Sequence, residues 1–239
     1  MNTKKSIFIF ILLPACINLL CIALYFSGIE FAQQLVAPTI SWLPQDSWRE
    51  MGILEQLQNI YLLAMLLLFI TAAINRTELI EKIFFVVATV FTLFLLLEEM
   101  DYGLHYYELI TGEHSGIEVR NWHNEETNNK QNVRYLKRIS DIMMATWFVI
   151  LPLFNNKIKN ELINSIIPSR WFIGTFFTAI IMGKLAHFFQ DNDFGIINGI
   201  QGNLDGNITE YREASNYYLY LLYAIQLSKT RLFTTHESD

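Results

Sequence analysis

The sequence predicts an all-α membrane protein, a bundle of six transmembrane helices with both termini in the cytoplasm. Hydrophobic residues make up 52% of the chain and charged residues only 17%, proportions typical of polytopic membrane proteins. Apolar runs long enough to cross a bilayer recur along the chain, and a Lys or Arg stands at the inner end of each, as the positive-inside rule requires. The expected location is a bacterial inner membrane.

The six spans are expected to form one domain over residues 1–239. Lys4 and Lys5 precede the first apolar run and hold the N-terminus inside, and this run is too long for the core of a cleaved signal peptide. Later boundaries are placed where polar or turn-forming residues return. The expected spans are residues 7–26, 57–74, 83–101, 141–155, 171–189 and 213–228, and the expected outer loops are residues 27–56, 102–140 and 190–212.

Composition and motifs exclude several classes of function. The net charge of -6 argues against a nucleic-acid partner, because no basic face is available to neutralise phosphates. Cys16 and Cys21 both lie in the first apolar run, where they are expected to be buried small residues and not a disulfide or a metal clip. No GxSxG motif marks a nucleophilic serine.

The third span ends in a group of ionisable residues. Its apolar run is followed by Glu98, Glu99, Asp101, His105 and Glu108. At 3.6 residues per turn, all of these except Glu99 fall along one stripe of a helix that continues beyond the span. Such a stripe marks either a membrane interface or a functional site.

Four spans carry an ionisable residue at nearly the same depth. Counted from the cytoplasmic Lys or Arg of each span, these residues are 16 or 17 positions away, or roughly 24 to 26 Å along a helix. They therefore meet at the outer membrane face if they point inward, although polar residues at a common depth also follow from equal span lengths. The four are Glu98, Asp141, His187 and Glu213.

The residue types in this group favour a divalent metal, with zinc the best match. His187 and Asp191 are spaced i to i+4 on one helical face, and a hydrolytic zinc needs three N or O ligands and an open position. A remaining carboxylate, Glu99 or Glu213, would act as general base. The complete set of expected metal ligands is Glu98, His105, His123, His187 and Asp191.

The order of these residues resembles that in the CAAX-processing and bacteriocin-processing intramembrane endopeptidases. The matching positions are the pair Glu98–Glu99, then His105 or His123, then His187 with Asp191. Gly103 stands where that family has an Arg, and the family's FxxxH motif is absent. The acid and imidazole set is also loosely similar to the ceramidase-like membrane hydrolases, whose HxxxH motif is missing here. Both resemblances imply a metal-dependent intramembrane hydrolase.

The sequence therefore favours a hydrolase that acts on a lipid, a lipid-linked molecule or a membrane peptide. A second interpretation is a non-enzymatic sensor, immunity protein or assembly factor, in which the polar ring only holds the bundle together. A third is a transporter that is coupled to protons or cations, although no inverted repeat or Gly/Pro-broken pair of helices supports it. The sequence does not decide the oligomeric state.

Overall fold

The computed structural model describes residues 2–43, 48–117, 130–158, 160–193, 196–197 and 199–230. Over these residues the chain is almost entirely helical, with one antiparallel ladder of two-residue strands. The α-helices are α1 (Thr3–Ile7), α2 (Leu13–Tyr25), α3 (Glu30–Val36), α5 (Ile53–Asn75), α6 (Leu79–Glu99), α7 (Leu104–Thr111), α8 (Lys130–Ala145), α9 (Leu151–Phe154), α10 (Glu161–Ile166), α11 (Phe172–Asp191) and α12 (Glu210–Lys229). The strands are β1 (Ile196–Ile197) and β2 (Ile200–Gln201). Short 3₁₀ turns cover Arg49–Met51, Asp101–Gly103 and Asn155–Lys157.

Within the described chain, five helices are long and apolar enough to cross a membrane. Each is at least 20 residues long, which gives about 30 Å of helix, the thickness of a bilayer core. The protein is therefore an all-α, multi-pass membrane protein. The five helices are Thr3–Tyr25, Ile53–Asn75, Leu79–Glu99, Arg138–Lys157 and Phe172–Asp191.

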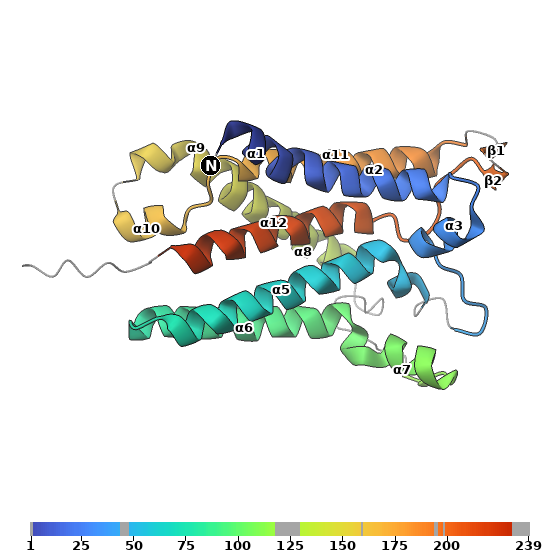
Figure 1. Ribbon diagram of the computed structural model, residues 1–239, viewed down its shortest axis with the longest axis horizontal. Coiled ribbons are helices and arrows are strands. Elements are labelled where there is room, and N and C mark those ends of the chain that lie inside the picture. Colours follow the sequence, from blue (N-terminus) through green and yellow to red (C-terminus); the bar gives the residue numbers. More distant parts are fainter. Residues whose placement is uncertain are drawn as a thin grey trace, which may run out of the picture.

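The centre of the bundle is α12, which is too polar to be one of those five helices. It lies between the α2/α11 pair and the α5/α6 pair (Figure 1) and packs against α5, α11 and α2. Each of the three clusters of buried hydrophobic residues contains side chains from α12: Ala214 in the first, Ala224 in the second and Leu219 in the third. Because other helices cover it, α12 needs no continuous apolar surface of its own.

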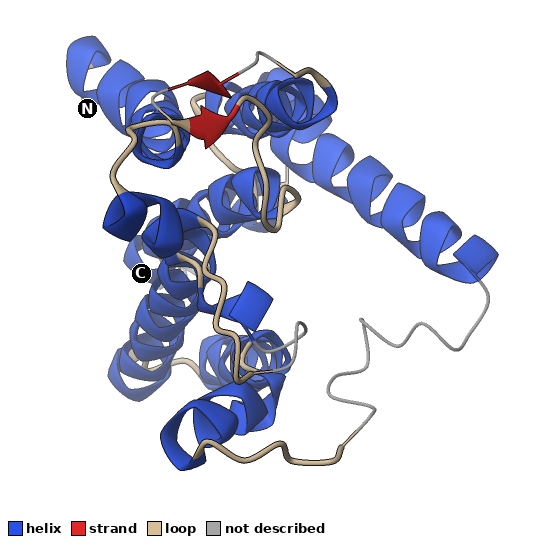
Figure 2. Cartoon of the chain, turned by 90° about the vertical axis from the view of Figure 1, so that its right-hand side faces the viewer, coloured by secondary structure: helices blue, strands red, loops and turns tan. Residues whose placement is uncertain are grey.

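We refer to the two ends of the bundle as the Arg76 end and the Glu99 end. The Arg76 end holds the turn between α5 and α6, the start of α1 and the end of α12, at the left of Figure 1. The Glu99 end holds the end of α6, together with α7, α3 and the two strands. Figure 2 views the bundle from the Glu99 end, where α8 tilts away from the other helices.

Two of the long helices contain a π-helical turn just before a proline. The turns cover Phe8–Leu12 and Thr146–Ile150, and Pro14 and Pro152 follow each of them by two residues. A proline inside a helix removes one hydrogen bond and crowds the carbonyl four residues earlier, and a π-turn relieves this crowding. The carbonyl freed by Pro14 belongs to Phe10, and it accepts a 2.7 Å hydrogen bond from the hydroxyl of Thr175 in α11.

The neighbouring carbonyl, that of Ile9, accepts a 3.0 Å hydrogen bond from the hydroxyl of Tyr218 in α12. The irregular turn of the first span is thus bonded to both α11 and α12. Gly174 leaves room for the side chain of Ile11 at this contact, because a Cβ at that position would lie 2.7 Å from Cγ1 of Ile11. The proline therefore fixes where the first span packs on the bundle.

Candidate functional site

The helix that was expected to continue from Glu98 to Glu108 is interrupted, and this expectation was wrong. α6 ends at Glu99, and the backbone then turns through three consecutive positive φ angles, 48° at Asp101, 54° at Tyr102 and 87° at Gly103. Only the glycine adopts this conformation without steric cost. Strained non-glycine residues are concentrated at functional sites, where the surrounding contacts hold them in place.

The four residues of the predicted stripe nevertheless share one environment. Glu98 is 4% exposed, Asp101 is 3% exposed, and His105 and Glu108 are fully buried. Ionisable groups inside a membrane protein are costly to bury, and they usually mark a site or a pathway. The break leaves Glu98 at the end of α6, Asp101 in the 3₁₀ turn, and His105 and Glu108 on α7, but it does not expose them.

His105 is the most unusual member of this group. Both of its ring nitrogens are buried, and neither has a hydrogen-bond partner within the described chain. Its Nδ1 lies 3.8 Å from Oδ2 of Asp101, which is beyond hydrogen-bond distance. The centre of its ring lies 4.2 Å from the ring centre of Tyr106. Most buried polar atoms in proteins are hydrogen-bonded, so an imidazole in this condition requires an explanation.

Other contacts hold α7 and its C-terminal turn in place. The hydroxyl of Tyr106 donates a 2.7 Å hydrogen bond to Oε1 of Gln56 in α5. Oε1 of Glu108 accepts a 2.9 Å hydrogen bond from the backbone N–H of Ser115 and lies 3.9 Å from Nδ1 of His114. His105 is therefore carried on a segment that is anchored at both ends.

The two carboxylates that the sequence suggested as general bases approach the same tyrosine. Tyr217 of α12 donates a 2.5 Å hydrogen bond to Oε1 of Glu99, and Glu213 lies close enough to interact electrostatically with Tyr217. One turn away, the hydroxyl of Tyr102 donates to Oε1 of Glu98. The end of α6 and the first half of α12 thus form one polar region at the Glu99 end.

Three further polar contacts join α12 to other helices. Its Glu210 accepts a hydrogen bond from Nε2 of Gln58 in α5, and Glu55 lies close to the same carboxylate. Its Arg212 pairs with Asp141 of α8. The third contact is a 2.9 Å hydrogen bond from Nδ2 of Asn18 in α2 to the hydroxyl of Ser215.

Sequence reasoning missed Glu55 and Gln58. Both are buried in α5, which begins at Ile53, whereas the sequence placed the start of this span at residue 57. Their spacing of three residues on one helical face was the available signal, but Glu55 was assigned to the preceding loop and only Gln58 to the span.

The structure does not bring His187 and Asp191 to this region. Both side chains are exposed on α11, as is that of Lys184, and Nδ1 of His187 lies 3.3 Å from Oε1 of Gln190 in the same helix. His123 lies outside the described residues. Among the residues that are described, no three His, Cys, Asp or Glu side chains gather closely enough to hold a metal ion, so the zinc site stays a prediction.

The structure thus joins the predicted base Glu99 to Tyr217, within electrostatic reach of Glu213, and it buries Glu98 at the end of α6 and His105 on α7. This is the candidate site: Glu98, Glu99, Asp101, His105, Glu108, Glu213 and Tyr217. Comparison of the chain with protein-family models, with curated proteins and with solved structures finds no match.

Proposed function

We propose that α12 is a sixth transmembrane helix and that both termini lie in the cytoplasm of a bacterium, with the bundle in the inner membrane. α12 is 20 residues long and ends at the Arg76 end, where the first span begins. Lys4, Arg76, Lys157 and Lys229 belong to helix ends and turns on that side. Cations on the cytoplasmic side support this orientation.

We further propose that the protein is a membrane hydrolase whose reacting groups lie at the Glu99 end. The observation that carries this proposal is His105, a fully buried imidazole beside the carboxylate of Asp101, neither of whose nitrogens has a hydrogen-bond partner among the described residues. Imidazole and carboxylate groups in such positions serve as general acids, general bases or metal ligands. The positive φ angles at Asp101 and Tyr102 support a functional role for the same segment.

In this proposal Glu99 and Glu213 are the candidate bases, and Tyr217 orients the carboxylate of Glu99. A bound divalent metal would supply an activated water, and His105, Glu98 and the undescribed His123 are the residues proposed to hold it. His187 and Asp191 are not included, because their side chains are exposed on α11. The depth of the site favours a lipid, a lipid-linked molecule or a membrane peptide as substrate.

The test is the metal content of the purified protein. The chain is purified in detergent without added metal, and zinc, manganese, iron and calcium are measured by elemental analysis. We expect near one metal per chain in the wild type, loss of the metal in His105→Ala and retention in His187→Ala, with all three proteins folded by size-exclusion chromatography. His187→Ala is the matched control, because it removes the same group from an exposed position.

A metal-free wild type, or loss of metal in His187→Ala but not in His105→Ala, would overturn the proposal. If the metal result is as expected, a screen of lipid and peptide substrates follows. There, Glu99→Gln is expected to reduce turnover at least about a hundredfold, the usual contribution of a general base, while metal content stays unchanged.

A second candidate function rests on a different observation, the polar side-chain contacts that join α12 to four other helices. Glu99–Tyr217, Gln58–Glu210, Asp141–Arg212 and Asn18–Ser215 join it to α6, α5, α8 and α2. Such contacts stabilise helix packing inside a membrane, as a non-enzymatic sensor, immunity or assembly protein would require. In that case His105→Ala would lower the amount of protein in the membrane, and the wild type would show no hydrolase activity.

A further inference from the structure

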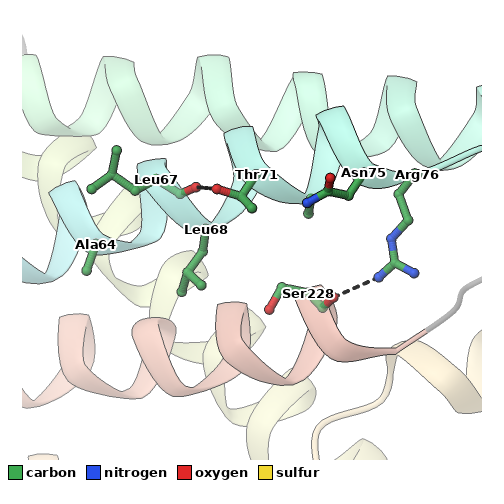
Figure 3. Close-up of a pocket in the computed structure, with 8 residues that line it drawn as sticks. Ala64, Leu67, Leu68, Thr71, Asn75, Arg76 and Ser228 are labelled. Carbon is green, nitrogen blue, oxygen red and sulfur yellow. Dashed lines mark hydrogen bonds between the residues drawn. The ribbon is translucent and has the colours of Figure 1, made fainter.

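A groove runs between α5 and α12 at the Arg76 end, far from the candidate site (Figure 3). Its volume is about 560 Å³, within the range of sites that bind small molecules. Most of its length is lined by apolar side chains, and polar groups gather at one end. The lining residues are Ala64, Leu67, Leu68, Thr71, Ala72, Asn75, Arg76 and Ser228.

Small side chains from both helices line the groove. α5 contributes Ala64, Thr71 and Ala72, and α12 contributes Ser228. The neighbouring face of α5 carries large exposed side chains, including Leu63 and Ile70. A hollow between two helices on the surface of a membrane bundle is filled by whatever surrounds the protein there, and that is hydrocarbon.

The length of the groove corresponds to one leaflet of a bilayer. Ala64 and Arg76 are 12 positions apart, or roughly 18 Å along a helix. The hydrocarbon core of a bilayer is about 30 Å thick, so each leaflet contributes about 15 Å. An acyl chain that follows the groove from Ala64 therefore ends with its head group near Arg76.

Arg76 is held in place at the polar end. Its Nη2 donates hydrogen bonds of 2.8 and 2.7 Å to the backbone carbonyls of Ser228 and Thr230, and its Nε lies 3.4 Å from Oε2 of Glu81. The guanidinium carbon also lies 5.3 Å from the ring centre of Phe85. None of these contacts, which are all to residues that the structure describes, uses Nη1, and its two N–H groups can donate to an anionic oxygen.

We propose that this groove binds one acyl chain of an anionic phospholipid, with the phosphate of the head group next to Arg76. The apolar walls match the chain, and the guanidinium matches the charge and the hydrogen-bonding geometry of a phosphate. In the proposed topology the Arg76 end faces the cytoplasmic leaflet, where a cation attracts anionic lipids. This site is separate from the candidate hydrolase site and does not depend on it.

The test compares two lipids with identical acyl chains, phosphatidylglycerol, which is anionic, and phosphatidylethanolamine, which has no net charge. The full-length protein in a mild detergent is titrated with each lipid, and bound lipid is counted by native mass spectrometry. We expect one phosphatidylglycerol per chain to bind about fivefold more tightly than phosphatidylethanolamine, the factor expected for one cation at a membrane surface.

Two pairs of variants locate the site. Thr71→Phe fills the groove and should weaken phosphatidylglycerol binding about tenfold, whereas Ile70→Phe adds the same ring to the exposed face of α5 and should have no effect. Arg76→Gln should remove the preference for phosphatidylglycerol, whereas Lys82→Gln, at an exposed position of the same end, should keep it. If Arg76→Gln does not fold, the Thr71→Phe and Ile70→Phe pair still decides the result.

Three outcomes would overturn the proposal. The first is equal binding of the two lipids by the wild type. The second is unchanged lipid binding in Thr71→Phe. The third is a dimer of the wild type that Thr71→Phe dissociates regardless of lipid, because the occupant of the groove would then be a second copy of the chain.

Discussion

Tyr217 and Glu99 join the central helix to the last residue of α6 through a hydrogen bond of 2.5 Å. The two residues are 118 positions apart in the sequence, so the bond closes the bundle between its third long helix and its last helix. It also places the phenol of Tyr217 against the carboxylate that we propose as a general base.

A double-mutant cycle measures the strength of this bond. We expect Tyr217→Phe and Glu99→Ala to show a coupling free energy of about 1 kcal/mol, because hydrogen bonds between membrane helices fall in this range. The measurement is denaturation of the purified protein in mixed micelles. Tyr218→Phe is the control, because Tyr218 donates to the carbonyl of Ile9 and its effect should add to that of Glu99→Ala. A coupling of zero for Tyr217 would contradict the contact.

Much of the helical architecture could be predicted from the apolar runs. The span expected at residues 171–189 corresponds to α11, and the one expected at 83–101 corresponds to α6, which ends two residues earlier. The break at Asp101 was missed because an acid-rich stretch with helical spacing gives no steric information. Gly103 was the clue to the turn, but its meaning depends on the backbone angles of the two residues before it.

The candidate site was predicted only in part, since depth along a helix can be counted whereas direction around it cannot. Glu98, Glu213 and His187 lie at similar distances from their cytoplasmic cations. The first two belong to the polar region between α6 and α12, but the side chain of His187 is exposed on α11. No single helix reveals which of its faces the rest of the bundle will cover.

The hydrogen bond from Tyr102 to Glu98 raises the pKa of Tyr102, because the neutral phenol donates to the carboxylate. A group with a raised pKa in the folded state stabilises the fold fully below its unfolded pKa, which is about 10 for tyrosine. This stabilisation is lost as the pH rises through the folded pKa. We expect Glu98→Gln to lower the pKa of Tyr102, as measured by NMR of ¹³C-labelled tyrosine, with the Tyr102→Phe spectrum to assign the resonance. An unchanged pKa would show that the carboxylate is not the cause.

Gly183 allows α11 and α12 to approach closely. A Cβ at this position would lie 2.9 Å from Cβ of Arg212, an atom that moves only with the backbone of α12. We therefore expect Gly183→Ala to destabilise the protein by about 1 to 3 kcal/mol, as overpacking does, and to weaken the pairing of Arg212 with Asp141. Gly174→Ala is the comparison, because there the added methyl meets the Ile11 side chain, whose outer atoms can rotate away. Equal melting temperatures of the two variants would contradict this interpretation.

The proline in the first span makes its packing sensitive to one hydroxyl. Thr175 supplies the hydrogen bond to the carbonyl of Phe10 that Pro14 leaves without its helical partner. Thr175→Val keeps the shape of the side chain and removes the donor, so a buried carbonyl loses its bond, at a cost of about 1 to 3 kcal/mol. Thr178→Val is the matched control, because the Thr178 hydroxyl donates to the carbonyl of Gly174 in its own helix, where no proline removes the backbone donor. We expect a lower melting temperature for Thr175→Val alone, and equal losses in both variants would show that the freed carbonyl has found another donor.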